Sequence, residues 1–493
     1  MWIEGLKVAI QLNNLIYLLL GTAVGLFVGV LPALGALFGL AIMLPFTYGL
    51  PAVTAIILLV AVHASCYYGD SVTSILINTP GGIGSVASCW DGYAMARQGK
   101  SATALGISTI GSFMGGIIGW LTLVAIAPLL TAFAIRISSA EYFMLGIMAL
   151  SLLSIAARGE TIKGLIMVCF GLSLAFVGQD PIEGLSYRFT FGSVYLEDGL
   201  PLVSVTVGLF ALSQAMVLVE EGGTIAEICE LSGSIWQGIK EAIRRPLTIL
   251  RAGMVGLWIG ILPALGPAAA NIIAYFVEKR ASKEPETFGK GNPAGLLAPE
   301  VSKNACAVGD MIPTFTLGIP GSASTAILLV ALTIHGLEPG PRFFLSGIEP
   351  YAVFSGILLA QFAFFVCGLF LARYFAKVVF IPNAILGPTI IFLSFIGSYA
   401  IRNRLEDVII TIVFGVIGYF FVKFRWPAPC LVLGLVLGDL IEKNFHRAVE
   451  IADGSYAVFV TRPTSLILLI ITLIFMLWPY YSEPLRNVFK RKS

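Results

Sequence analysis

Apolar residues fill most of the chain in runs long enough to cross a membrane. These runs occupy residues 15–30, 52–62, 104–134, 143–155, 164–177, 200–219, 352–371, 381–396, 408–422, 431–440 and 465–478. A membrane-spanning helix needs roughly 20 mostly apolar residues, so the pattern predicts an all-α polytopic membrane protein with about 11–13 membrane segments.

Two of the apolar segments carry nearly the same eleven letters. Residues 25–35 read GLFVGVLPALG, and residues 256–266 read GLWIGILPALG. Proline removes a backbone donor and glycine weakens a helix, so each copy should interrupt its helix. We therefore predict helix breaks at Pro32 and Gly35 and again at Pro263 and Gly266.

A second pair of breaks follows in the same order. Asp70 is followed ten positions later by Pro80, and Asp310 is followed ten positions later by Pro320, each proline preceding a glycine. The offset between the copies grows from 231 residues (256 minus 25) to 240 (310 minus 70), because only the second half holds the polar loop EKRASKEPETFGKG.

These landmarks divide the chain into two repeated halves. The first covers residues 11–215 and the second 245–440, with a polar linker at 216–244 and an extra C-terminal span with a basic tail at 441–493. Inverted repeats most readily build one shared site at mid-membrane, so we expect the halves to be inverted. The polar segment around residues 180–199 should lie outside the membrane and have some strand character.

Broken helices at matched positions are typical of secondary transporters, because unpaired backbone is tolerated in a membrane only inside protein or beside a watery cavity. We expect two re-entrant hairpins with tips at Pro80 and Pro320. Helix N-termini at the tips would bind an anion, and free carbonyls would bind a hard cation. The alternative for each hydroxyl is a bond back to its own helix.

The candidate residues follow from this picture. The substrate-binding candidates are Asn78, Thr79, Pro80, Gly81, Gly82, Ser85, Gly318, Pro320, Gly321, Ser322, Ser324 and Thr325. The coupling-ion candidates are Asp70, Ser74, Asp310, Thr314 and Thr316.

Composition supports a membrane protein and narrows the chemistry. Charged residues make up 12% of the chain, against about 25% in soluble proteins. A net charge of +2 gives no reason to expect a nucleic-acid partner. The seven cysteines and three histidines are scattered without metal-ligand spacing. We therefore expect no cofactor and no bound transition metal, with Na⁺ or H⁺ as coupling ion.

The longer motifs resemble those of one transporter family. GVLPALG, ILINTPGG, DGYAMARQGKSATALGI, LAPEVSKNA and TLGIPGSASTAILLVALTIHGLEPGP follow one another as in the large membrane subunit of tripartite tricarboxylate transporters, the TctA family. The similarity extends over residues 20–440 and assigns the hairpin motifs to residues 78–81 and 318–322.

The resemblance implies a multi-pass permease of the bacterial inner membrane that imports organic di- or tricarboxylates along an ion gradient. It also implies two partners, a small TctB-like membrane subunit and a periplasmic TctC-like solute-binding protein. The apolar helices around residues 104–134 and 350–376 could form a scaffold and a homodimer interface.

The chain departs from the family pattern at three charged residues, where small or neutral ones are expected: Asp70, Asp310 and Lys303. Ionisable residues inside a membrane are costly unless they function. The two carboxylates could bind or exchange the coupling cation. Alternatively, Lys303 could neutralise Asp310, although seven residues separate them by about 10 Å on a helix. Both carboxylates could also lie solvated at the membrane interface.

Two rival functions remain at this point. A channel would pass ions without a binding protein. An intramembrane aspartyl protease would use Asp70 and Asp310, since PAL occurs twice and a glycine precedes each of these aspartates. However, the GxGD motif requires glycine where this chain has Tyr67 and Ala307. We therefore expect a carrier and not an enzyme.

Overall fold

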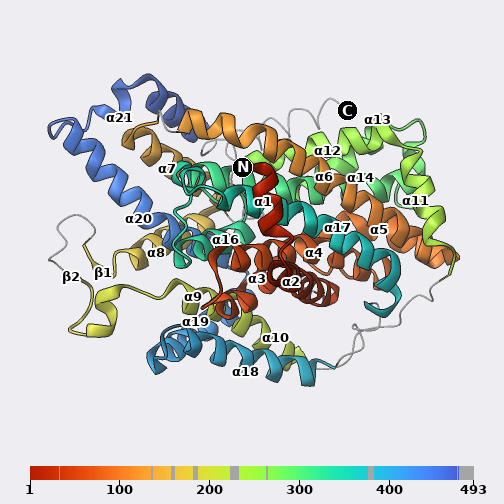
Figure 1. Ribbon diagram of the computed structural model, residues 1–493, viewed down its shortest axis with the longest axis horizontal. Helices are drawn as coiled ribbons and strands as arrows, with labels where there is room; N and C mark the ends of the chain where they lie inside the picture. Colours follow the sequence, from red (N-terminus) through yellow and green to blue (C-terminus); the bar gives the residue numbers. More distant parts are fainter. Residues whose placement is uncertain are drawn as a thin grey trace, which may run out of the picture.

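The computed structural model describes residues 1–32, 34–134, 137–156, 161–180, 187–221, 232–262, 265–375, 382–474 and 476. Over these residues the chain is a bundle of helices with one small sheet (Figure 1). The helices are α1 (Trp2–Ala9), α2 (Leu12–Val30), α3 (Gly35–Met43), α4 (Ala52–Ile77), α5 (Val86–Met95), α6 (Ser101–Ala134), α7 (Ser139–Ala156), α8 (Thr161–Ala175), α9 (Leu202–Thr206), α10 (Ser213–Glu221), α11 (Ile235–Ile243), α12 (Pro246–Ile261), α13 (Gly266–Ala281), α14 (Pro293–Gly309), α15 (Met311–Leu317), α16 (Ala323–Ile334), α17 (Glu349–Phe375), α18 (Asn383–Arg402), α19 (Leu405–Lys423), α20 (Ala428–Ile451) and α21 (Val458–Thr461).

The predicted helical membrane fold is confirmed at this level. In the described part of the chain, 7 helical segments are long and apolar enough to cross a membrane: Leu12–Val30, Ala52–Ile77, Ile83–Ala132, Leu202–Glu220, Glu349–Phe370, Asn383–Arg402 and Leu405–Lys423. Shorter apolar helices occupy Gly35–Thr47, Ser139–Leu152, Thr161–Ala175, Pro246–Ile261, Ala323–Ile334 and Pro463–Ile474.

Helix α4 lies at the centre of the bundle and is buried from Thr54 to Ile77. Helix α2 packs along it at very short range. A Cβ built on Gly25 would lie 2.5 Å from the Val62 carbonyl oxygen, and one on Gly29 would lie 2.4 Å from the Cys66 carbonyl oxygen. Glycines spaced four apart allow membrane helices to approach this closely.

Helix α14 repeats this arrangement with α12. Every residue of α14 from Gly295 to Gly309 is buried. A Cβ on Gly256 would lie 2.3 Å from the Ser302 carbonyl oxygen, and one on Gly260 would lie 2.8 Å from that of Cys306. The glycines of the repeated eleven letters therefore bring a helix onto a buried central helix in both places.

The letters after these glycines end the outer helices. Helix α2 ends at Val30 and α3 begins at Gly35 (φ +65°), so Pro32 lies between two helices. Helix α12 ends at Ile261, and α13 begins at Gly266 (φ +63°). Pro263 lies outside the described residues.

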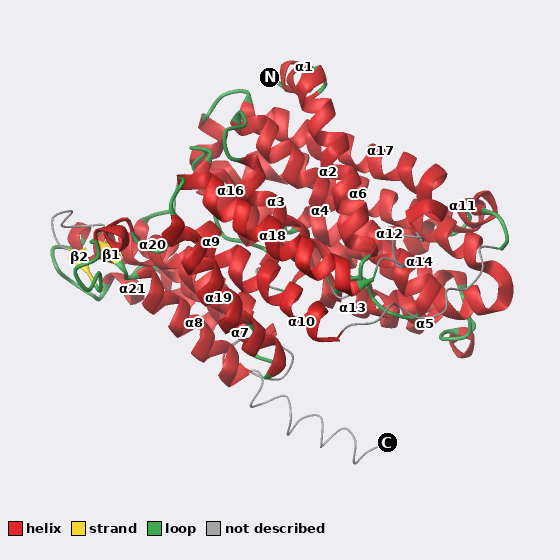
Figure 2. Cartoon of the chain, turned by 90° about the horizontal axis from the view of Figure 1, so that it is seen from below, coloured by secondary structure: helices red, strands yellow, loops and turns green. Residues whose placement is uncertain are grey.

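The polar segments lie at opposite ends of the molecule, with the sheet at one end and α5 and α11 at the other (Figures 1 and 2). Strand β1 (Gly178–Gln179) pairs antiparallel with β2 (Tyr187–Arg188), in the segment predicted to have strand character. Arg188 donates to both carboxylate oxygens of Glu442 on α20, and these bonds hold the pKa of its guanidinium above the ordinary value. Part of the predicted linker forms α11. Residues 222–231 of the linker and the basic tail lie outside the described residues.

Candidate functional site

The first Pro-Gly break folds back against Asp70. Helix α4 ends at Ile77, Asn78 takes a left-handed conformation (φ 57°), and α5 begins at Val86 after a short 3-10 turn. The Gly81 amide donates to the Asp70 carbonyl oxygen at 3.2 Å. A Cβ on Gly82 would lie 2.5 Å from Asp70 Oδ2, so the carboxylate is pressed against the tip of the break.

The second Pro-Gly break folds back against Asp310. Helix α14 ends at Gly309, Asp310 separates it from the short α15, and Gly318 (φ 70°) ends α15. The Gly321 amide donates to Thr314 Oγ1 at 3.3 Å. A Cβ on Gly321 would lie 2.5 Å from the Asp310 carbonyl oxygen.

Each Pro-Gly break also touches the LPALG break that precedes it in the chain. A Cβ on Gly35 would lie 3.1 Å from the Gly82 Cα atom, and one on Gly266 would lie 3.3 Å from the Ser322 Cβ atom. The four sequence landmarks therefore form two clusters, each made of one LPALG break, one Pro-Gly break and one aspartate.

The two clusters meet at Tyr67 on α4. Its hydroxyl shares a hydrogen bond of 3.1 Å with Ser324 Oγ on α16, and its ring lies 3.1 Å from where Gly84 would carry a Cβ. His63, one turn earlier on α4, shares a second bond of 3.1 Å with the Ser324 hydroxyl. The residues just after the first Pro-Gly break and just after the second thus surround one side chain.

Asp70 and Asp310 are buried carboxylates that accept no hydrogen bond of good geometry from the described residues, although the Ser322 hydroxyl is close enough to act on Asp310. Their side chains are 1% and 0% exposed, and none of their four carboxylate oxygens has a partner among the described residues. This burial overturns the interpretation that they are solvated at the interface. An isolated ionised carboxylate inside protein costs several kcal/mol, so such groups are stable only with a proton or a cation.

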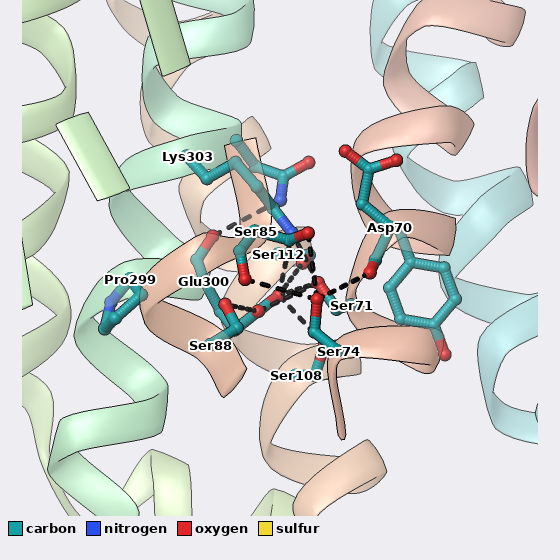
Figure 3. Close-up of polar contacts among 12 residues, drawn as sticks. Asp70, Ser71, Ser74, Ser85, Ser88, Ser108, Ser112, Pro299, Glu300 and Lys303 are labelled. Carbon is teal, nitrogen blue, oxygen red and sulfur yellow. Dashed lines mark hydrogen bonds and ion pairs between the residues drawn. The ribbon is translucent and has the colours of Figure 1, made fainter. Parts of the chain in front are cut away.

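A third buried carboxylate, Glu300 on α14, has the opposite surroundings (Figure 3). Four serine hydroxyls donate to it at 2.5 to 3.0 Å, and we call them the serine cage: Ser71, Ser88, Ser108 and Ser112. Lys303 Nζ lies 3.2 Å from Glu300 Oε2 and also donates to Ser71. Both charged side chains are 0% exposed.

The serine cage joins four helices at one point, because its members lie on α4, α5 and α6 while Glu300 lies on α14. It also corrects one sequence interpretation: Lys303 forms its ion pair with Glu300 and not with Asp310. Sequence reasoning missed Glu300 and the cage. The sequence signal that could have revealed them is Glu300 followed three positions later by Lys303 in an apolar helix. Side chains three positions apart on a helix can meet.

Several predicted hydroxyls bond back to their own helices. Ser74 and Thr314 donate to the carbonyl oxygens of Asp70 and Asp310 at 2.9 and 2.7 Å, and Thr316 donates to Ile312 at 2.7 Å. These three hydroxyls therefore bond back to their own helices, as in the alternative interpretation. Each hydroxyl oxygen still keeps a lone pair with which it can accept or coordinate.

The other tip residues differ in burial and in bonding. Asn78 is exposed and Thr79 and Pro80 are half-buried, whereas these are buried: Gly81, Gly82, Ser85, Gly318, Pro320, Gly321, Ser322, Ser324 and Thr325. Ser322 caps α16: its hydroxyl accepts from the Thr325 amide, and the Thr325 hydroxyl accepts from the Ser322 amide.

Asp91, in the DGYAMARQG stretch, anchors the polar loop that precedes α14. Its carboxylate accepts from the amides of Gly289, Gly291 and Asn292 and from the Tyr275 hydroxyl. This carboxylate is therefore a structural anchor between α5 and the segment that joins α13 to α14. In the described residues, no group of three or more acidic, histidine or cysteine side chains could hold a metal ion.

Comparison with known proteins identifies the family to which the chain belongs. The profile of the tripartite tricarboxylate transporter TctA family matches residues 15–433. An uncharacterised 52.8 kDa protein in the TAR-I ttuC' 3' region of Agrobacterium vitis is 35% identical over 474 residues, covering 95% of this chain and 93% of that protein. An uncharacterised protein in the TAR-II ttuC' 3' region of the same organism is 38% identical over 219 residues, 43% of this chain and 89% of that protein. The chain therefore belongs to the TctA family, and it is a multi-pass membrane component of a tripartite tricarboxylate transporter.

Proposed function

We propose that this protein is the carrier subunit that moves organic di- or tricarboxylates into the cell across the bacterial inner membrane, driven by a Na⁺ or H⁺ gradient. Its substrate would arrive on a periplasmic solute-binding protein, and a small membrane subunit would complete the complex. Family membership supports the class of substrate and the partners. The observation that supports ion coupling is the pair of buried, unpartnered carboxylates, each beside a broken helix.

The coupling cation is assigned to Asp70 and Asp310. Other oxygens lie near the backbone of Asp70, since a Cβ on Gly81 would lie 2.6 Å from the Asp70 Cα atom, 2.3 Å from the Gly29 carbonyl oxygen and 2.9 Å from Thr73 Oγ1. Carboxylate, carbonyl and hydroxyl oxygens are the ligands that hard cations prefer. Ser74, Thr314 and Thr316 would contribute their remaining lone pairs, and a proton on each carboxylate would serve the same purpose.

The substrate is assigned to the tips of the two breaks, where Tyr67 and Ser324 already bring the halves into contact. The N-terminus of α16 is suited to a carboxylate, because the first-turn amides other than the capped Thr325 amide have no helical carbonyl to bond and carry partial positive charge. A cation on Asp310 would offset the repulsion between that carboxylate and the anion. Binding of each ion would therefore lower the electrostatic cost of binding the other.

The two halves would be inverted repeats, since each contributes one cluster to the shared centre. Transport would move the clusters against a scaffold that includes α17, while α6 would move with the clusters because its Ser108 and Ser112 donate to Glu300. A homodimer would form through the scaffold. The glycine contacts of α2 on α4 and of α12 on α14 support equivalent roles for the two halves.

Counterflow tests this proposal directly. The protein, its small membrane subunit and the cognate binding protein are reconstituted in vesicles with mono-, di- and tricarboxylates, and Na⁺ and pH are varied independently. We expect uptake of a di- or tricarboxylate that depends on one cation gradient and on the binding protein. Uptake that persists without any gradient or binding protein would contradict a carrier and indicate a channel.

Point variants test which residues bind the coupling cation and which bind the substrate. Asp70→Asn and Asp310→Asn should each abolish the cation dependence, and Asp439→Asn is the control, because Asp439 is 60% exposed and pairs with Lys443. Asn78→Ala and Ser322→Ala should weaken the apparent affinity for substrate. If both leave it unchanged in protein that inserts normally, the tips are not the substrate site.

A further inference from the structure

Lys303 is a buried ammonium beside two acidic groups. Its Nζ atom contacts Glu300 and the Ser71 hydroxyl, and Ser71 follows Asp70 directly in the chain. The charged groups that act on the Asp70 carboxylate are Lys303, which attracts it, and Glu300, which repels it. In Figure 3 the Asp70 carboxylate stands apart from the serine cage and points away from it.

Glu300 can remain stable when the ammonium moves away. An ionised carboxylate has about four lone-pair sites, and the four hydroxyls of the serine cage supply four donors to the two Glu300 oxygens, with the Ser71 hydroxyl shared between them. Among the described residues Asp70 has no such donors. Lys303 has a flexible four-carbon stem that passes the first Pro-Gly break, and its ammonium bonds the residue next to Asp70, so it is able to serve both carboxylates.

The two halves treat this position differently. Lys303 lies seven residues before Asp310, and His63 lies seven residues before Asp70. Each side chain reaches the break of the other half: the Lys303 stem passes 3.5 Å from the Cβ position of Gly84, and His63 bonds to Ser324. The Lys303 ammonium is paired with a carboxylate, whereas histidine is readily neutral near pH 7. The cluster at Asp70 therefore has a cation attached to the protein beside it, and the cluster at Asp310 has an imidazole at the same place.

We propose that Lys303 is a tethered counter-ion, which pairs with Glu300 when a cation occupies Asp70 and turns to Asp70 when that cation leaves. This inference rests on the proposed coupling role of Asp70. It makes the two cation sites unequal: the Asp70 site competes with Lys303 and is the weaker, while the Asp310 site has no fixed competitor. It also lets the Asp70 cluster return empty without an uncompensated charge.

Cation titrations of the purified full-length chain in detergent test this inference. Thermal unfolding is followed while Na⁺ replaces choline at constant ionic strength and pH, and in parallel while pH is lowered at constant Na⁺. The Asp310→Asn background isolates the Asp70 site. In that background we expect Lys303→Met to lower the half-saturating concentration of the stabilising cation by about tenfold, equivalent to about 1.4 kcal/mol of binding free energy. Lys303→Arg, which keeps the charge, should leave the half-saturation near that of the parent.

The outcomes separate the two proposals. If Lys303→Met weakens or does not change the half-saturation of the Asp70 site while wild-type protein responds to the cation, the tethered counter-ion is wrong and the coupling proposal stands. If wild-type protein shows no saturable response to Na⁺ or H⁺, both proposals fail. Lys303→Gln is made in parallel because it keeps a donor for Ser71, and size-exclusion profiles exclude variants that do not fold. Should both neutral variants be unfolded while Lys303→Arg is intact, Lys303 is a fixed structural ion and the inference is overturned.

Discussion

Replacing Glu300 with alanine should destabilise the whole helix bundle, since Glu300 is the acceptor for groups from four helices. The change removes the partner of the Lys303 ammonium, which lies 3.2 Å away with both side chains 0% exposed. Leaving one member of a buried ion pair without its partner costs about 3–5 kcal/mol. The proposed turn of Lys303 to Asp70 would offset part of this cost, so we expect the lower end of that range. The serine cage also loses its acceptor, but serines in helices can turn to the carbonyl four residues earlier, so we expect this loss to add only about 1 kcal/mol.

The assay is thermal unfolding of the purified full-length chain in detergent, with a double variant as the decisive comparison. Glu300→Gln keeps an acceptor oxygen and should unfold between wild type and Glu300→Ala. Removing both charges together, as Glu300→Leu with Lys303→Met, should recover part of the loss, because replacing a buried pair by apolar side chains is often close to neutral.

An exposed pair of the same kind serves as the control. Arg342 and Glu338 are 2.8 Å apart but 71% and 62% exposed, so Glu338→Ala should not shift the unfolding temperature measurably. If Glu300→Ala unfolds at the wild-type temperature, or if the double variant is no more stable than Glu300→Ala, the pair does not hold the helices together and the electrostatic reasoning is wrong.

Three further predictions concern single contacts. Gly321→Ala would place a Cβ 2.5 Å from a backbone oxygen and should lower the unfolding temperature and the cation response, whereas Gly309→Ala, whose nearest neighbour would be 3.5 Å away, should be tolerated. Asp91→Ala should speed hydrogen exchange at the amides of residues 289, 291 and 292 by about tenfold or more, because hydrogen bonds to charged groups contribute about 1.5–3 kcal/mol; Asp453→Ala, at an exposed aspartate, should leave that exchange unchanged. Ser322→Ala should cost about 1 kcal/mol by removing the cap of α16, and Thr333→Ala, exposed on the same helix, should cost less in the same unfolding assay; equal losses would argue against the cap.

The sequence was sufficient to locate the breaks, because a proline or a glycine in an apolar run has a local consequence. Helices end just before Pro32 and Pro80, and both aspartates proved to be buried. The number of spans was harder to predict. The same breaks divide the apolar sequence runs into helices that are too short to cross a membrane alone, such as α15 and α16. The number of apolar runs therefore does not equal the number of membrane spans.

The surroundings of Lys303 could not be read from spacing alone. Its distance of seven residues from Asp310 puts both on one helical face, but side chains on a helix lean toward its N-terminus, so Lys303 reaches Glu300 and not Asp310. The serine cage depends on tertiary packing. Ser71, Ser88 and Ser108 are 17 to 20 residues apart in the chain (88 minus 71, 108 minus 88), and nothing local shows that α4, α5 and α6 turn these hydroxyls to one point.

The crossed contacts restrict how the two clusters can move relative to each other. Tyr67 and His63 on α4 hold Ser324 of the second break, and Lys303 on α14 packs against the first break while Glu300 binds Ser71 and Ser88 beside it. Each central helix is thus bonded to residues at the Pro-Gly break of the other cluster. A displacement of one cluster alone would break buried polar bonds at both tips, whereas a displacement of α4, α5, α6, α14 and α16 together would leave these bonds and the serine cage intact. The motion that costs less free energy is therefore that of one rigid body containing both carboxylates. A change of charge at Asp70 and a change of charge at Asp310 would then act on the same moving body.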